Sequence, residues 1–305
     1  MVLAILDFGT NTFNLLIAER KDRRFEIIHT SKQPVKLGRG GIQVNRITPD
    51  ALERGFVAIA NLMETISQYQ VDQIRAFATS AIRNAKNGQE FVDEVKKRFG
   101  FRTRVISGKR EADLIYKGVR QAIPIKKENM LILDIGGGSN EFIICNQDGI
   151  IWKKSFELGM ARILERFTLS DPITPEEIRA LESYFRQELQ PLLERVKKEK
   201  PTALIGASGS FDTFHAMISL SKGLEADGLH GRELPLKTYR KLHKQLLRST
   251  TEARKAMPGM EAVRVEMIVA ATIFVSFVLR ACQLKHLYHS EFSLKEGVIS
   301  ELAGL

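Results

Sequence analysis

Two segments of this sequence align with each other without a gap, and each opens one half of the chain. Residues 3–17 read LAILDFGTNTFNLLI, and residues 130–144 read MLILDIGGGSNEFII. In both, an apolar run ends in Asp-x-Gly, a polar turn follows, and a second apolar run begins, which is the pattern of two strands joined by a turn. Since the acid, the glycine and the hydroxyl coincide, chance similarity between two hydrophobic hairpins is the weaker explanation. The repeat predicts a duplicated lobe with a cleft between the copies.

The pattern around the repeat is that of an α/β protein with a partly parallel sheet, because apolar runs alternate with segments of helical spacing. The second half is richer in helix. Strands are expected at 2–8, 14–20, 24–38, 72–80, 102–107, 129–136, 141–147, 150–157, 202–207 and 286–290. Helices are expected at 48–70, 88–100, 110–123, 158–167, 173–199, 209–221, 235–249, 257–282 and 293–304.

A change from strand-rich to helix-rich sequence marks a domain boundary near residues 123–128, IPIKKE. We therefore expect an N-terminal α/β lobe over 1–124 and a C-terminal α/β lobe over 125–305. The final helix, about 293–305, is expected to pack back on the first lobe.

Cysteine content and hydropathy bear on the compartment. Cys145 and Cys282 are the two cysteines and lie far apart in sequence, which favours a reducing compartment over a disulfide framework. The N-terminus has neither a basic segment nor a small-residue cleavage site. The longest apolar run, Met267 to Leu279, is too short to cross a bilayer. We expect a cytoplasmic protein that does not span the membrane.

The net charge of +10 favours a polyanionic partner: nucleic acid, an anionic membrane, or a phosphate-rich molecule. Basic residues are densest at 194–200 and 236–248, where solvated helix faces are the simpler explanation. No nucleic-acid-binding signature accompanies them, so nucleic acid is not favoured as a partner.

The two polar turns have the composition of a phosphate site. Glycine lets an anion approach the backbone N–H groups because no Cβ blocks the way, and hydroxyl and amide side chains add donors. The candidate phosphate-binding residues are Gly9, Thr10, Asn11, Thr12, Gly136, Gly137, Gly138 and Ser139.

Acids stand beside these turns, although carboxylates repel phosphate. Asp7 and Asp134 make chemical sense if a divalent cation lies between carboxylate and phosphate, usually through water, because Mg²⁺ dehydrates reluctantly. Glu141, on the outgoing strand, can point the same way as Ser139 because side chains alternate. The alternative is that the glycines only close a tight turn and the acids are exposed loop residues.

Five motifs together resemble the exopolyphosphatase/guanosine pentaphosphate phosphohydrolase family of the actin, Hsp70 and sugar-kinase superfamily. They are DFGTNTFNLLI, FATSAIRNAKNG, ISGKREADLIYKGV, LDIGGGSNEFII and LIGASGSFDT. The resemblance implies two ribonuclease H-like lobes, as in actin-like ATPases, with a central cleft. It also implies a hydrolase that uses Mg²⁺ or another divalent cation and serves the stringent response. The partners it implies are polyphosphate or guanosine penta- and tetraphosphate, with release of the terminal phosphate or of the 5′-γ-phosphate of pppGpp.

The same resemblance implies roles for single residues. Glu111 aligns with a glutamate that positions or deprotonates the attacking water, and Arg83 with an arginine that reaches the phosphates. Asp134 and Glu141 align with metal-associated positions. Taken alone, Glu111 is an acid in the first turn of a helix, where the macrodipole favours it, and Arg83 reads as a surface arginine.

Some positions depart from the family pattern or leave alternatives open. Arg110 stands where relatives often have an acid, so Glu111 is left as the candidate base. The sequence ends at Leu305, whereas longer relatives carry a further helical domain that helps to hold extended polyphosphate. The resemblance therefore does not imply processive hydrolysis of long chains, and it leaves the substrate preference open. An ATP-dependent kinase or ATPase, and a non-catalytic alarmone or polyphosphate sensor, remain as rival functions. The apolar C-terminal helices fit either a core or a homodimer surface.

Overall fold

The computed structural model describes residues 1–22, 24–221, 223 and 233–304. It contains two five-stranded mixed sheets with the same strand order. The first sheet runs β3-β2-β1-β4-β5, and the second runs β8-β7-β6-β9-β10, so corresponding strands of the two halves occupy corresponding places. The strands are β1 (Val2–Phe8), β2 (Thr12–Lys21), β3 (Arg24–Pro34), β4 (Gln73–Ala78), β5 (Thr103–Val105), β6 (Met130–Ile135), β7 (Asn140–Asn146), β8 (Gly149–Phe156), β9 (Ala203–Ala207) and β10 (His286–Ser290).

The register repeats as well as the order. β1 pairs antiparallel with β2 and parallel with β4, just as β6 pairs antiparallel with β7 and parallel with β9. The two-lobed α/β fold expected from the internal repeat is confirmed.

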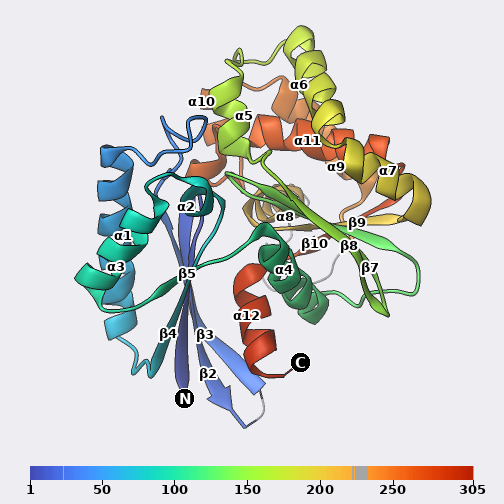
Figure 1. Cartoon of the computed structure of the whole chain (residues 1–305). Coiled ribbons are helices and arrows are strands. Elements are labelled where there is room, and N and C mark those ends of the chain that lie inside the picture. Colours follow the sequence, from blue (N-terminus) through green and yellow to red (C-terminus); the bar gives the residue numbers. More distant parts are fainter. Residues whose placement is uncertain (23, 222, 224–232, 305) are drawn as a thin grey trace.

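Helices cover the sheets and separate the two lobes (Figure 1). The first half contributes α1 (Pro49–Ser67), α2 (Ser80–Asn84), α3 (Gly88–Phe99) and α4 (Gly108–Ala122). The second half contributes α5 (Met160–Arg166), α6 (Pro175–Glu188), α7 (Gln190–Glu199), α8 (Gly209–Leu220), α9 (Leu236–Leu247), α10 (Thr251–Lys255), the 3₁₀ turn η1 (Ala262–Arg264), α11 (Ile268–Ala281) and α12 (Leu294–Leu302). None of the described helices is long and apolar enough to cross a bilayer.

Two expected helices are divided in the structure. The helix expected at 173–199 is α6 followed by α7, and Pro191 lies in the first turn of α7. Proline has no N–H and its ring clashes with the preceding turn, so one continuous helix is not formed. The helix expected at 257–282 begins only at Ile268, because Gly259 adopts a positive φ of 82° and the chain passes through η1 first.

α4 and α12 lie against each other between the two sheets (Figure 1). Their crossing is close because each helix has a glycine there. A Cβ on Gly118 would lie 1.9 Å from the carbonyl oxygen of Ser293, and one on Gly297 would lie 1.8 Å from that of Leu114. Lys117 on α4 also binds Glu301 on α12 at 2.7 Å. The C-terminal helix is thereby held against the last helix of the first lobe, and it also contacts β1.

One hydrophobic cluster joins the two halves. It includes Ile5 of β1, Ile132 of β6, Leu114 of α4 and Val298 of α12, all buried. Because these side chains pack at the base of the interlobe space, the ends of β1 and β6 and the turns after them are brought face to face. The sheet core therefore positions the site described next.

Candidate active site

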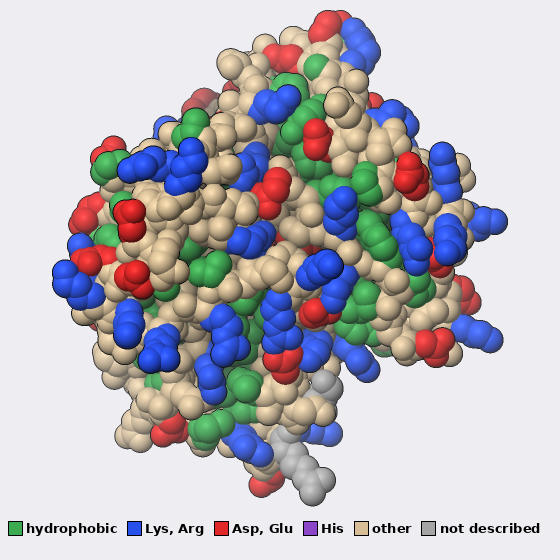
Figure 2. Space-filling view, viewed as in Figure 1, with side chains coloured by type: hydrophobic (Ala, Val, Ile, Leu, Met, Phe, Trp, Pro, Cys, Tyr) green, Lys and Arg blue, Asp and Glu red, His purple; other side chains and the backbone are tan. Residues whose placement is uncertain are grey.

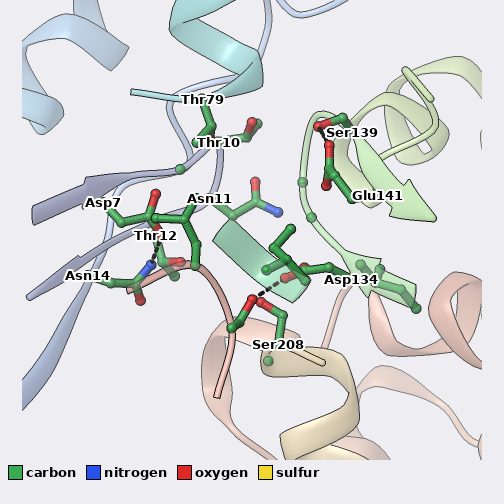
Figure 3. Close-up of a pocket in the computed structure, with 18 of the residues that line it drawn as sticks. Asp7, Thr10, Asn11, Thr12, Asn14, Thr79, Asp134, Ser139, Glu141 and Ser208 are labelled. Carbon is green, nitrogen blue, oxygen red and sulfur yellow. Dashed lines mark hydrogen bonds between the residues drawn. The ribbon is translucent and has the colours of Figure 1, made fainter. Parts of the chain in front are cut away.

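The two glycine-containing turns face each other across a cavity of about 130 Å³ between the lobes. A Cβ on Gly137 would lie 2.6 Å from the side-chain nitrogen of Asn11, and one on Gly138 would lie 2.6 Å from the hydroxyl of Thr10. Figure 3 shows Asp7, Thr10 and Asn11 on one side of this cavity and Asp134, Ser139 and Glu141 on the other. The repeated segments thus form the two walls of one pocket.

Both turns are closed by the same hydrogen bond. The N–H of Gly9 donates to the carbonyl of Thr12 at 3.1 Å, and the N–H of Gly136 donates to that of Ser139, also at 3.1 Å. A Cβ on either glycine would come within 2.8 Å of the accepting oxygen, so these closures require glycine. The cavity is lined by all eight candidate phosphate-binding residues: Gly9, Thr10, Asn11, Thr12, Gly136, Gly137, Gly138 and Ser139.

Asp7, the penultimate residue of β1, lines the pocket, and one of its carboxylate oxygens has no hydrogen-bond partner among the described residues. Its Oδ2 accepts a hydrogen bond from Asn14 at 3.0 Å, while its Oδ1 is buried and has no hydrogen-bond partner in the described part of the chain. Burial raises the pKa of the Asp7 carboxyl, and the positive charge of Lys295 opposes this rise. A buried orphan oxygen is costly unless a ligand or ion satisfies it.

Asp134 occupies the corresponding place at the end of β6. The hydroxyls of Ser293 and Ser208 both donate to its carboxylate. Burial raises the pKa of Asp134 to about 6 in spite of these bonds, and the charge of Asp7 adds to the rise. Ser293 precedes α12, so the C-terminal helix supplies part of this wall.

Glu141 lies behind Ser139 on β7. Its Oε1 accepts hydrogen bonds from Ser139 at 2.8 Å and from Ser155 at 2.7 Å. Burial raises its pKa well above the ordinary value, and the negative charge of Glu111 raises it further. The Ser139 hydroxyl therefore links the second glycine turn to this buried acid.

Glu111 and Arg83 form an ion pair at the edge of the same pocket. Ser107 caps α4 by accepting the N–H of Arg110 at 3.2 Å, which places Glu111 in the first turn. Nη1 of Arg83 then donates to Oε2 of Glu111 at 2.7 Å, and its Nη2 lies 3.5 Å from the hydroxyl of Ser139. The guanidinium thus connects an acid of the first lobe with the glycine turn of the second.

Burial is the main influence on Glu111. It raises the pKa of this carboxyl to about 7, while Arg83 lowers it and the charges of Asp7 and Asp134 raise it again. Six acids are among the described residues that line this small cavity: Asp7, Glu111, Asp134, Glu141, Asp212 and Glu291. Poor solvation and mutual repulsion raise the pKa of Asp7, Glu111, Asp134 and Glu141. Asp212 is the exception: burial is outweighed there by the hydrogen bond and charge of His289, so the pKa of that carboxyl is lowered.

These acids can hold a cation only together with water. Among the described residues, no group of three or more histidine, cysteine, aspartate or glutamate side chains is placed to hold a metal ion directly. The orphan Oδ1 of Asp7 and the carboxylates of Asp134 and Glu141 nevertheless form an all-oxygen donor set. Such a set fits Mg²⁺, which keeps several waters and takes one or two carboxylates rather than an all-protein cage.

The structure adds residues that no sequence pattern singled out. Ser293 and Lys295, from the start of α12, line the pocket near Asp134 and Asp7, and Ser80, from the start of α2, binds Glu157 at 3.0 Å. Nothing local in these serines or this lysine points to a site, because they reach the pocket through packing of distant elements. The one local pattern is that of Ser293, which is the N-cap of α12 and forms a capping box with Glu296.

Other candidate positions have structural partners. Lys36, in the loop that follows β3, reaches across the lobes to Glu266 at 2.8 Å. Gly209 makes room for Arg264, whose guanidinium nitrogen would lie 1.8 Å from a Cβ there, and Gly206 packs against the ring of Phe211. Gly206 thus serves close packing of β9 against α8, whereas Gly209 and Arg264 both line the catalytic cavity.

Comparisons with known proteins extend over the whole chain. The model of the Ppx/GppA phosphatase family matches residues 16–304. Exopolyphosphatase 2 of Mycobacterium tuberculosis is 27% identical, over 99% of this chain and 98% of that protein. A putative exopolyphosphatase of Haemophilus influenzae is 26% identical, over 98% of this chain and 91% of that protein.

Solved structures agree with these matches. The crystal structure of an exopolyphosphatase from Cytophaga hutchinsonii is 36% identical, has a TM-score of 0.96, and covers 100% of this chain and 98% of its own. The Ppx/GppA family member of Aquifex aeolicus is 26% identical, has a TM-score of 0.81, and covers 100% of this chain and 98% of its own. The likeness therefore includes both lobes and is not confined to the hairpin motifs.

Proposed function

The chain belongs to the Ppx/GppA phosphatase family, as its motifs indicated, and on this basis we propose that it is a phosphohydrolase that releases terminal phosphate by direct attack of water. Its proposed substrates are inorganic polyphosphate and the 5′-γ-phosphate of pppGpp. The observation that carries the proposal is the Arg83–Glu111 pair, 2.7 Å apart, set beside a pocket made by two glycine turns.

The turns supply the phosphate-binding side of the mechanism. Their backbone N–H groups and the hydroxyls of Thr10, Thr12 and Ser139 are donors that suit phosphate oxygens. The terminal and penultimate phosphates would lie between the turns, since the turns form opposite walls of the cavity. Holding the phosphates there supplies the positioning on which phosphoryl transfer chiefly depends.

Asp7, Asp134 and Glu141 would hold a divalent cation with its waters. When bound, the cation neutralises phosphate charge that would otherwise meet a cavity lined with acids. The orphan oxygen of Asp7 and the raised pKa values of Asp134 and Glu141 support this assignment, because no positively charged group of the described residues lies within hydrogen-bonding distance of these three carboxylates.

Glu111 would act as the general base. A carboxyl with a pKa of about 7 can take a proton from an attacking water near neutral pH and release it again. Arg83 holds this carboxylate in place and has its second nitrogen directed to Ser139, so it can also neutralise charge on the terminal phosphate. The two residues thus combine water activation with charge stabilisation.

The test is to compare kcat/KM for short polyphosphate, long polyphosphate and pppGpp with purified protein and Mg²⁺. Phosphate release without any nucleotide supports a hydrolase and contradicts an ATP-dependent kinase or ATPase. Tight binding of guanosine tetraphosphate or polyphosphate with no release under any cation condition would favour the sensor function instead. The ranking of the three kcat/KM values identifies the preferred substrate.

A further inference from the structure

A second pocket, away from the catalytic one, lies against the open edge of the first sheet. It has a volume of about 590 Å³ and is formed by β4, β5, the start of α4 and the end of α12. Lys and Arg side chains gather over this part of the surface (Figure 2). Four arginines line the pocket: Arg75, Arg102, Arg104 and Arg110.

The short edge strand creates this pocket. β5 has three residues and pairs with Ala76–Ala78, so among the described strands the first half of β4 has no neighbour on that side. Arg104 is in register with Phe77, and Arg75 lies two residues before Phe77, so all three share one face of the sheet. Phe77 belongs to the cluster that includes Val298 of α12, so this face is directed toward α12.

Positive charge in the pocket is poorly balanced. Glu301 is the one acid among the described lining residues, and its carboxylate is already bound by Arg110 and Lys117. Within the described part of the chain, Arg75, Arg102 and Arg104 have no ion pair, and Nε of Arg75 is buried without a hydrogen-bond partner. A buried donor left unpaired is costly, so an incoming anion would satisfy it.

We infer that this pocket is a second anion site, which binds the phosphates of an oligophosphate chain outside the catalytic cavity; the inference deepens the proposed function and rests on it. Guanidinium groups are planar forks that grip two phosphate oxygens at once, and several of them face one concave surface here. Among the described lining residues the one aromatic ring is that of buried Phe77. A stacking platform for single-stranded nucleic acid is therefore missing from them.

The pocket is within reach of the catalytic site. Arg75 lies in β4, and Thr79, the residue directly after this strand, lines the catalytic cavity. The two are four residues apart, or about 13 Å at roughly 3.3 Å per residue. Arg110 also directly precedes Glu111 in α4. The phosphates can therefore come from two sources: the tail of a chain whose end is in the catalytic cavity, or a separate short oligophosphate.

The test compares two double variants that remove the same charge. The first double variant combines Arg102→Gln and Arg104→Gln. Both arginines are exposed, so the variant should fold. Lys197→Gln with Lys200→Gln is the matched control, since both lysines line a different basic pocket, on the second lobe. Binding of long polyphosphate and of tripolyphosphate is measured by calorimetry in the Glu111→Gln background, and tripolyphosphate hydrolysis is measured with Glu111 intact.

If the pocket binds the tail of a substrate chain, the affinity for long polyphosphate should fall at least about tenfold in the Arg102/Arg104 variant. Two charge-assisted contacts are lost, and about 1.4 kcal/mol corresponds to a factor of ten. The lysine control should retain that affinity, and tripolyphosphate turnover should not change. For a separate oligophosphate, the background protein should bind two tripolyphosphates per chain and the Arg102/Arg104 variant one.

Unchanged long-chain affinity with equal tripolyphosphate stoichiometry would overturn the inference. It would mean that the arginines only protect the edge strand β5 from pairing with another chain, which is a common use of edge charges. RNA binding as tight as polyphosphate binding, lost in the same variant, would overturn the ligand class. Binding is measured separately from turnover, so the two proposals can fail independently. If the protein hydrolyses no substrate, the hydrolase proposal is refuted. If polyphosphate binding is still lost in the Arg102/Arg104 variant, the anion site stands.

Discussion

Replacing Glu111 by glutamine should slow hydrolysis and, at the same time, raise the free energy of unfolding above neutral pH. The side chain is buried in a cavity that it shares with five other acids among the described residues, and its ionised form is needed for water activation under the proposed mechanism. Glutamine keeps the shape and can accept the hydrogen bond of Arg83, but carries no charge. Function and stability therefore make opposite demands on this position.

The size of the stability gain follows from the pKa. Burial raises the Glu111 pKa from the ordinary 4.5 to about 7, and one pKa unit corresponds to about 1.4 kcal/mol. The ionised carboxylate therefore costs the fold at most about 3 kcal/mol above pH 7. Because the neighbouring acids titrate together with Glu111, a gain of about 1–3 kcal/mol is expected for Glu111→Gln.

The difference in unfolding free energy between the variant and the wild-type protein depends on pH. A carboxyl whose pKa is raised on folding contributes its full stability below the unfolded value, near 4.5, and loses it as the pH rises through the folded value, near 7. The variant and the wild-type protein should therefore have similar unfolding free energies at pH 4.5. The variant should be more stable at pH 8. Urea denaturation at the two pH values measures both differences.

Turnover should fall by about 10²–10⁴-fold, the usual range for loss of a general base, while substrate affinity changes little. In the wild-type protein, kcat/KM should rise with pH up to about 7, as Glu111 ionises, and this rise should be absent from the variant. Glu157→Gln is the control for activity: this carboxylate also faces Arg83, at 3.7 Å, but its side chain is 47% exposed. A small loss of turnover is expected for it.

Two results would refute the reasoning. Unchanged turnover in Glu111→Gln would remove Glu111 from the role of base. A lower unfolding free energy than wild type at pH 8 would show that the ion pair with Arg83 outweighs the burial of the charge.

Three further predictions concern the helix crossing, the glycine turns and the cation. Gly297→Ala should destabilise the protein by about 1–3 kcal/mol in urea denaturation, because the new Cβ would lie 1.8 Å from the carbonyl oxygen of Leu114. An unchanged urea midpoint would contradict the close crossing of α4 and α12. Gly137→Ala should lower kcat/KM at least about tenfold, since its Cβ would lie 2.6 Å from the side-chain nitrogen of Asn11 and fill part of the cavity. A kcat/KM equal to that of the wild-type protein would exclude phosphate binding at this turn. Chelation of divalent cations should abolish phosphate release, and Asp134→Asn should raise the Mg²⁺ concentration for half-maximal activity at least about tenfold; activity that persists in chelator would rule out the assigned cation role.

Features that depend on neighbouring residues were predicted more accurately than features that depend on residues far apart in the sequence. The hairpin β1–β2 and its copy β6–β7 were predicted with their glycines, because a turn and the strands around it depend on residues next to one another. Helix boundaries were less accurate. The breaks at Pro191 and Gly259 went unpredicted, although both residues carry a local signal, because apolar helical spacing continues on either side.

The residues that surround the acids were less accessible from sequence. Asp7, Asp134 and Glu141 were predicted to lie together, and they line one cavity. Ser293 and Lys295, which face two of these acids, were not predicted, because more than 150 residues separate Ser293 from Asp134 and no spacing relates them. The separate roles of Arg83 and Glu111 were implied by a family resemblance, whereas the contact between them is seen only in the structure. Neither residue by itself indicated a site.

The sequence by itself determined the duplicated lobe and the identity of the two turns, since a repeated strand–Asp-x-Gly–strand pattern restricts local backbone conformation whatever surrounds it. Only the tertiary structure decided the proton affinity of the acids and the grouping of the arginines beside β5. Both depend on burial and on charges brought together through space. Those quantities arise when the sheets and the α4–α12 crossing pack, and no local pattern encodes them.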